Sequence, residues 1–120
     1  MPGGTQGKKS FLNISHLQFP LKEEVIEKLG ESKGGWVERI VSEGHTTAEG
    51  QWYDQITDEW VLLMQGKAIL EFMNDESIEL HEGDYYFIPA GMKHRVSYTS
   101  SEPKCIWLAI HFNKQNTEIK

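Results

Sequence analysis

The sequence has little of what a disulfide-bonded, membrane-spanning or nucleic-acid-binding protein needs. Its single cysteine, Cys105, excludes an intrachain disulfide framework and a cysteine-rich zinc site. The longest unbroken apolar runs, 60–64 and 105–110, fall far short of the roughly 20 residues of a transmembrane helix. The 12 basic and 18 acidic residues give a formal net charge of −6, which disfavours a phosphate-backbone partner. Because residues 1–10 also lack the apolar stretch of a secretory signal, we expect a cytoplasmic protein without nucleic-acid or membrane partners.

Aromatic residues are plentiful, and the length of 120 residues suits one domain. Four Trp, four Tyr and five Phe argue against a disordered chain. Composition shifts along the sequence predict a flexible tail over 1–10, an N-terminal segment over 11–35, a barrel over 36–113 and a second flexible tail over 114–120.

Secondary-structure patterns predict an all-β fold with one short helix. Leu21, Val25 and Leu29 recur at helical spacing before Gly30, so a helix is predicted over 21–29. The short segment 11–14 also suits an edge strand. Eight short strands are expected after residue 35, because segments rich in β-branched and aromatic residues alternate with turn residues. Their ranges are 36–41, 51–55, 59–65, 67–73, 77–81, 85–88, 94–99 and 104–112. Such a series predicts an antiparallel sandwich or barrel.

Two spaced motifs resemble those of the cupin superfamily. Glu59 is followed after six residues by Gly66. Gly83, five residues, Pro89, one residue, Gly91, two residues and His94 form the second motif. The resemblance implies a double-stranded β-helix, a jelly-roll-like antiparallel barrel.

The chain departs from the family pattern at the expected metal ligands. Metal-binding cupins carry two histidines, one residue apart, upstream of the motif glutamate. The matching positions here are Tyr53 and Gln55 or, shifted by one residue, Trp52 and Asp54. The resemblance therefore supports the barrel and implies a degenerate ligand set.

Glu59, His94 and His111 are the main candidates for that ligand set, with Gln55 as a further oxygen ligand. Glu59 points into the barrel if it belongs to the strand with Val61, and is otherwise a solvated loop acid. His94 is either a ligand or general base, or a histidine bound to a backbone carbonyl. His111 points inward only if the Trp107 face of its strand does. Two histidines and one carboxylate would suit iron, manganese, nickel or zinc.

The function expected from these residues is binding of a small molecule, and of a divalent metal, in the barrel interior. Tyr53, Asp54 and Tyr98 are the expected ligand-binding residues. The alternative is a metal-dependent enzyme of the dioxygenase or isomerase type that uses Glu59, His94 and a replacement ligand such as His111. A homodimer is also expected, because both faces of strand 59–65 are apolar.

Overall fold

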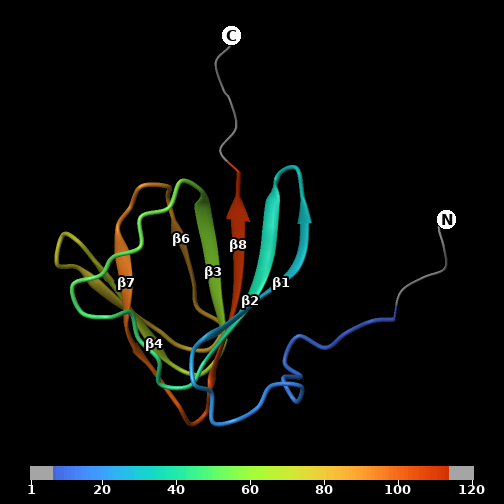
Figure 1. Cartoon of the computed structure of the whole chain (residues 1–120). Helices are drawn as coiled ribbons and strands as arrows, with labels where there is room; N and C mark the ends of the chain where they lie inside the picture. The colour runs from blue at the N-terminus through green and yellow to red at the C-terminus, as the bar shows by residue number, and fades with distance from the viewer. Residues whose placement is uncertain (1–6, 114–120) are drawn as a thin grey trace.

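The computed structural model describes residues 7–113, in which every regular element is a β-strand. The strands are β1 (Val25–Ser32), β2 (Gly35–Ser42), β3 (Asp58–Gln65), β4 (Ala68–Phe72), β5 (Ser77–Leu80), β6 (Tyr85–Ile88), β7 (His94–Thr99) and β8 (Cys105–Phe112). They form a five-stranded sheet in the order β1-β2-β8-β3-β6 and a three-stranded sheet in the order β5-β4-β7. All pairs are antiparallel (Figure 1). The predicted all-β fold is therefore confirmed.

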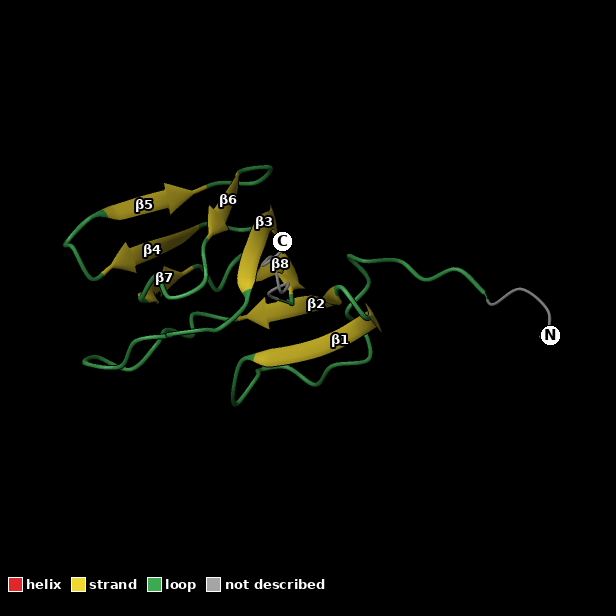
Figure 2. Cartoon of the chain, turned by 90° about the horizontal axis from the view of Figure 1, so that it is seen from above, coloured by secondary structure: helices red, strands yellow, loops and turns green. Residues whose placement is uncertain are grey.

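The two sheets face each other, and the core lies between them. Figure 2 shows the three-stranded sheet on one side and the β3, β8 and β2 strands on the other. Side chains at alternate positions of each strand point to the same face. In β3 and β8 this alternation buries Val61, Leu63, Trp107 and Ala109 against Leu70 and its neighbours in β4.

The helix predicted over 21–29 is wrong, because this segment leads into and forms β1. Strand β1 pairs with β2 from Val25↔Val41 to Ser32↔Gly35. A nine-residue helix has little stability of its own. Pairing with β2 satisfies the backbone of β1 on one side and covers the edge of β2 that would otherwise be free, so β1 becomes the edge strand of the sheet. Burial alternates at the start of this strand, since Val25 and Glu27 are half-buried while Ile26 and Lys28 are exposed.

Seven of the eight predicted barrel strands match β2 to β8 to within one or two residues. The eighth, over 51–55, is reduced to one isolated bridge between Tyr53 and His94. Residues 11–14 form a turn and coil rather than a strand. Of the predicted tails, residues 1–6 and 114–120 lie outside the described residues. Within the described part of the chain, no helix could span a membrane.

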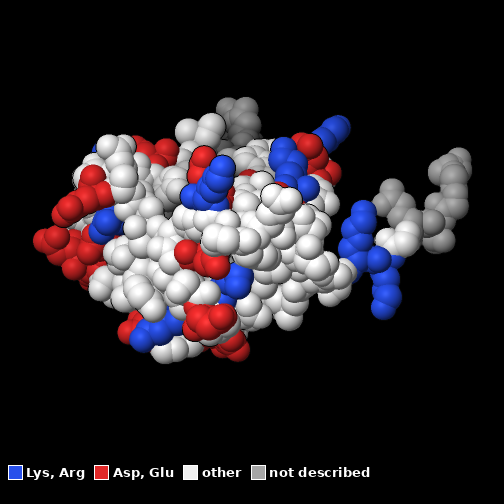
Figure 3. All heavy atoms as spheres, turned by 60° about the horizontal axis from the view of Figure 1, so that its bottom comes forward, with Lys and Arg blue, Asp and Glu red and all other residues white. Residues whose placement is uncertain are grey.

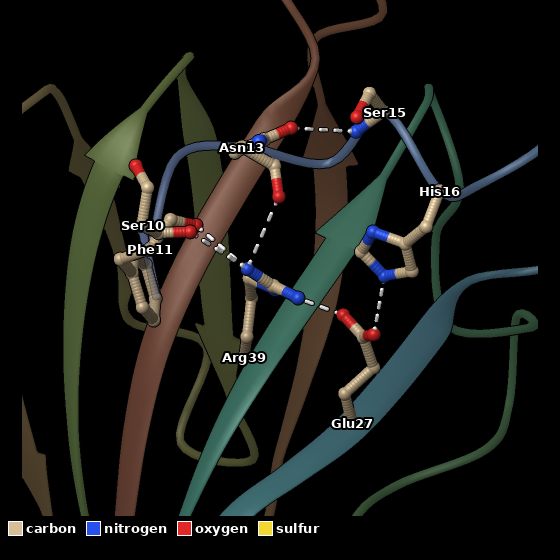
Figure 4. Close-up of polar contacts among 7 residues, drawn as sticks. All are labelled: Ser10, Phe11, Asn13, Ser15, His16, Glu27 and Arg39. Carbon is tan, nitrogen blue, oxygen red and sulfur yellow. Dashed lines mark hydrogen bonds and ion pairs between the residues drawn. The ribbon is translucent and has the colours of Figure 1, made fainter. Parts of the chain in front are cut away.

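Arg39 of β2 holds the N-terminal segment against the outside of the barrel. Its guanidinium donates hydrogen bonds to the Glu27 carboxylate at 2.8 Å and to the Phe11 carbonyl at 2.9 Å (Figure 4). His16 contacts the other oxygen of Glu27 at 2.6 Å. Arg39 is only 7% exposed, and a buried charge is costly unless it is paired. Glu27 and the surrounding carbonyls compensate the charge of this guanidinium. These contacts lower the pKa of Glu27, mainly through the hydrogen bond from Arg39.

The outer face of the five-stranded sheet is largely apolar over β3, β6 and β8. Tyr85, Phe87 and Phe112 are 65%, 47% and 44% exposed, and they pair across strands with other outward-facing positions. Half-buried Trp60, Leu62, Leu108 and Ile110 share that face. Strand β3 is thus apolar on both faces, as the sequence indicates.

Candidate functional site

Strand pairing brings Glu59 and His111 side by side at one end of the barrel. The two residues are direct partners in the antiparallel β3–β8 pair, so both side chains point to the same, inner face. His94 begins β7 in the opposite sheet, where it pairs with Phe72 of β4. The three side chains therefore meet across the gap between the sheets.

These three residues line a cavity of about 90 Å³ in the barrel interior. Its other lining residues are mostly apolar and come from both sheets and from the segment before β1. The remaining lining residues are Glu24, Ile26, Glu38, Ile40, Tyr53, Gln55, Val61, Leu70, Ile88, Val96 and Trp107. Ile26 and Tyr53 are 55% and 41% exposed, so the cavity meets solvent beside them. An apolar cavity with a few convergent polar groups is the usual composition of a small-molecule site.

Glu59 is the central polar group of the cavity. Its side chain is buried, and its two oxygens lie 3.9 Å from His94 Nε2 and 3.7 Å from His111 Nε2. Both separations are longer than a hydrogen bond. Burial, and secondarily the charge of Glu38, raises the pKa of Glu59 to about 7, although a hydrogen bond from the Gln55 amide opposes this. Glu59 can therefore gain or lose a proton near neutral pH.

His94 presents an unprotonated nitrogen to the cavity. Its Nδ1 lies 3.0 Å from the carbonyl oxygen of Met92. Since a carbonyl only accepts hydrogen bonds, Nδ1 carries the proton, and Nε2 of the neutral ring has a free lone pair. Burial lowers the pKa of His94, against a smaller raising effect of the Met92 hydrogen bond. Tyr53 stacks on the ring, with centroids 5.5 Å apart.

His111 is held by partners on both ring nitrogens. Nδ1 lies 3.1 Å from the Thr57 hydroxyl, and Nε2 lies 3.2 Å from Glu38 Oε1. Because a carboxylate accepts, Nε2–H donates to Glu38 and Nδ1 accepts from Thr57. Trp36 stacks on the ring at 4.7 Å and donates its indole N–H to the other oxygen of Glu38. Thus His111 is more tightly positioned than His94.

The structure brings most of the sequence-predicted site residues together. Glu59, His94, His111, Gln55 and Tyr53 all line the cavity. Glu59 belongs to the strand rather than to a solvated loop, and the Trp107 face of β8 is the inner one. His94 both bonds a backbone carbonyl and faces the cavity, so its two readings are compatible.

Asp54 and Tyr98 do not line the cavity. Asp54 is exposed next to Tyr53, whose bridge to His94 fixes which of the two faces inward. A register shift in the β4–β7 pair places Tyr98 opposite Ile69, on the outer face. Tyr98 is 43% exposed and lines a separate surface depression with Gly66 and Lys67.

Glu24 and Glu38 are cavity residues that sequence reasoning missed. Period-2 alternation groups Glu38 with Trp36 and Ile40, but only the β2–β8 pairing shows that this face is the inner one. Glu24 directly precedes β1, in the segment that was predicted as a helix. The sequence therefore gave no indication that its side chain faces the cavity.

The cavity residues suit a divalent ion in chemistry but are not preassembled around one. Carboxylate and imidazole donors are typical ligands of such ions. Two ligands bound at about 2.1 Å to one ion lie roughly 3.0 to 3.4 Å apart, so the Glu59–histidine separations would have to shorten by less than about 1 Å. His111 would also have to give up the proton that it donates to Glu38. Within residues 7–113, no group of three or more His, Cys, Asp or Glu is already arranged to hold a metal.

Comparison with known protein families matches residues 40–111 to the model of the cupin domain. The chain is a cupin. The matched residues begin near the end of β2 and extend into β8, and they include Glu59, His94 and His111.

Solved structures share the fold of this cupin. A protein of Ralstonia eutropha JMP134, named a "putative mannose-6-phosphate isomerase", is 31% identical, with 91% of this chain and 100% of that chain covered and a TM-score of 0.82. A cupin superfamily protein of Desulfitobacterium hafniense DCB-2 is 19% identical, with 92% and 94% covered and a TM-score of 0.71. Among curated proteins, none matches this cupin.

Proposed function

We propose that this cupin binds a small organic molecule in the barrel cavity. The observation that supports this most directly is the polar cluster of Glu59, His94 and His111, which lies in a cavity whose other lining residues are mostly apolar. Buried polar groups are costly without partners, so their retention in one cavity fits a ligand-binding role better than a purely structural one.

The binding proposal is tested by nuclear magnetic resonance with a panel of alcohols, amines and acids of three to five carbons at millimolar concentration. We expect shifts of backbone signals confined to cavity-lining residues. The variant Ile40→Trp fills the cavity and should abolish these signal shifts. The control Ile69→Trp lies on the outer face of β4 and should leave the shifts unchanged. Shifts scattered over the surface, or unchanged in a folded Ile40→Trp variant, would contradict the proposal.

A metal-dependent enzyme of the dioxygenase or isomerase type is the second candidate. The supporting observation is that Nε2 atoms of both histidines face the same carboxylate, at 3.7 and 3.9 Å. The name of the Ralstonia protein favours the isomerase type within that candidate. A carboxyl group with a pKa of about 7 also suits proton transfer at neutral pH. Iron, manganese, nickel or zinc would be held by Glu59, His94 and His111, with Gln55 as a further oxygen ligand.

Metal analysis after purification without chelators separates the two candidates. A stoichiometric transition metal that disappears in His94→Ala, and persists in the control His81→Ala, would favour the enzyme; the His81 side chain is 60% exposed. Protein without metal, whose folding is unchanged by chelators, would favour the binding protein. The cytoplasmic location and the lack of nucleic-acid and membrane partners stay predictions from composition.

A further inference from the structure

Hydrogen-bond acceptors, carboxylates above all, predominate among the polar groups that line the cavity. Three carboxylates, those of Glu24, Glu38 and Glu59, face the interior, and the described lining includes no Lys or Arg. Two neutral acceptors join them. The Gln55 side-chain oxygen is buried without a hydrogen-bond partner, and His94 Nε2 has a free lone pair. A ligand that fits this lining must bring hydrogen-bond donors.

Donors from the protein satisfy only part of this demand. Ser42 donates to one oxygen of Glu24 at 2.9 Å. Trp36 and His111 donate to the two oxygens of Glu38 at 2.8 and 3.2 Å, and the Gln55 amide donates to Glu59. Each carboxylate has further lone pairs. The two arginines are committed elsewhere, Arg39 to Glu27 outside the barrel and Arg95 to Glu71. The described lining therefore holds no Lys or Arg side chain that would neutralise the negative charge of the cavity.

The lining of the cavity differs in this respect from the face of the molecule shown in Figure 3. The face seen in Figure 3 carries acidic and basic side chains close together, with uncharged areas between them. Burial of like charges without counter-charge is unfavourable, and a bound cation relieves it. A phosphate or carboxylate ligand would add to the repulsion.

The walls favour an organic cation over a hydrated ion. Most of the lining is aliphatic, and the rings of Tyr53 and Trp107 border the same space. Aliphatic walls pack against an alkyl group, and aromatic faces attract an ammonium. The volume of about 90 Å³ is smaller than the roughly 150 Å³ cavity that accommodates benzene, so the enclosed part of the ligand has only a few heavy atoms.

From this lining we infer that the cavity binds a small protonated primary amine with a short aliphatic body, and that it rejects anionic and phosphorylated molecules. The ammonium lies among Glu38, Glu59 and the Gln55 oxygen, and the aliphatic part contacts Ile40, Val61 and Leu70. This inference rests on the proposed binding of a small molecule and specifies its class. An enzyme that acts on phosphosugars must bind an anionic substrate. This lining repels such a substrate unless a bound metal supplies the missing positive charge.

The test compares three molecules of similar shape and different charge: isobutylamine, isobutanol and isobutyrate. Binding is measured by nuclear magnetic resonance titration at pH 7 in phosphate buffer, which contains no competing amine, with a chelator present to remove metal ions. We expect the amine to bind at least about tenfold more tightly than the alcohol and isobutyrate not to bind. The variant Glu38→Gln should weaken amine binding about tenfold and leave alcohol binding unchanged. The control Glu31→Gln, at an exposed position of β1, should change neither.

Each other outcome has a defined meaning. An amine that binds no better than the alcohol, or isobutyrate or mannose 6-phosphate binding without metal, would overturn the assignment of ligand class. Alcohol binding in the cavity would then still support the proposed small-molecule function. If amine binding is lost in the presence of the chelator and restored by zinc, the ligand site is a metal site, and the assignment is overturned in favour of the second candidate.

Discussion

Replacing Glu59 with Gln should make the protein more stable at high pH and not at low pH. Glu59 is 6% exposed, and burial raises its pKa from 4.5 to about 7. A carboxyl group with a raised folded-state pKa contributes stability that is fully present below the unfolded-state pKa and lost as the pH rises through the folded-state pKa. The window of loss therefore runs from about pH 4.5 to about pH 7.

The expected size follows from the shift. One pKa unit corresponds to about 1.4 kcal/mol, so ionisation of Glu59 costs the folded state about 3 kcal/mol above pH 7. Glu59→Gln has nearly the same shape and cannot ionise. Any cost of the amide in the cavity is common to all pH values, so the informative quantity is how the stability difference changes with pH.

Urea unfolding of both proteins at about pH 4, 6 and 8 measures that quantity. We expect the free energy of unfolding of Glu59→Gln, relative to the unsubstituted protein, to rise by about 3 kcal/mol between pH 4 and pH 8. The control Glu49→Gln lies at an exposed loop position and should show no such change. A stability difference that stays constant over this range would refute the reasoning that burial disfavours the ionised form of Glu59.

Three further predictions concern the core, the N-terminal segment and the outer face. Leu63→Ala, at a fully buried position, should lower the free energy of unfolding by about 3 kcal/mol in urea; a change below 1 kcal/mol would mean that the core is not packed around this side chain. Arg39→Met should free the N-terminal segment from Glu27 and the Phe11 carbonyl, which accelerated hydrogen exchange over residues 10–17 would report without a change at the cavity. The homodimer expected from the sequence predicts that Phe87→Lys, on the apolar outer face, yields monomers in light scattering, and a monomeric unsubstituted protein would contradict it.

Local signals in the sequence were sufficient for the all-β class and for most strand positions. The segments that became β2 to β8 alternate apolar and polar residues or are apolar on both faces, and glycines separate them. Gly66 is one such position, because its φ of 98° and its contact with Cys105 leave no room for a side chain. The spacing around Glu59 and His94, which resembles the cupin motifs, likewise indicated the barrel, but it left open whether these two side chains point into the interior.

Only the tertiary structure decided which neighbours those groups have. The segment 21–29 has apolar spacing that fits a helix, but the free edge of β2 makes it a strand, since backbone pairing across 25–32 outweighs weak local propensity. The same pairing brings Glu24 to the cavity, and the β2–β8 register places Glu38 beside His111. A sequence lists side chains in one dimension, whereas the charge of a cavity depends on which strands face each other, so the acidic character of this interior could be seen only in the folded chain.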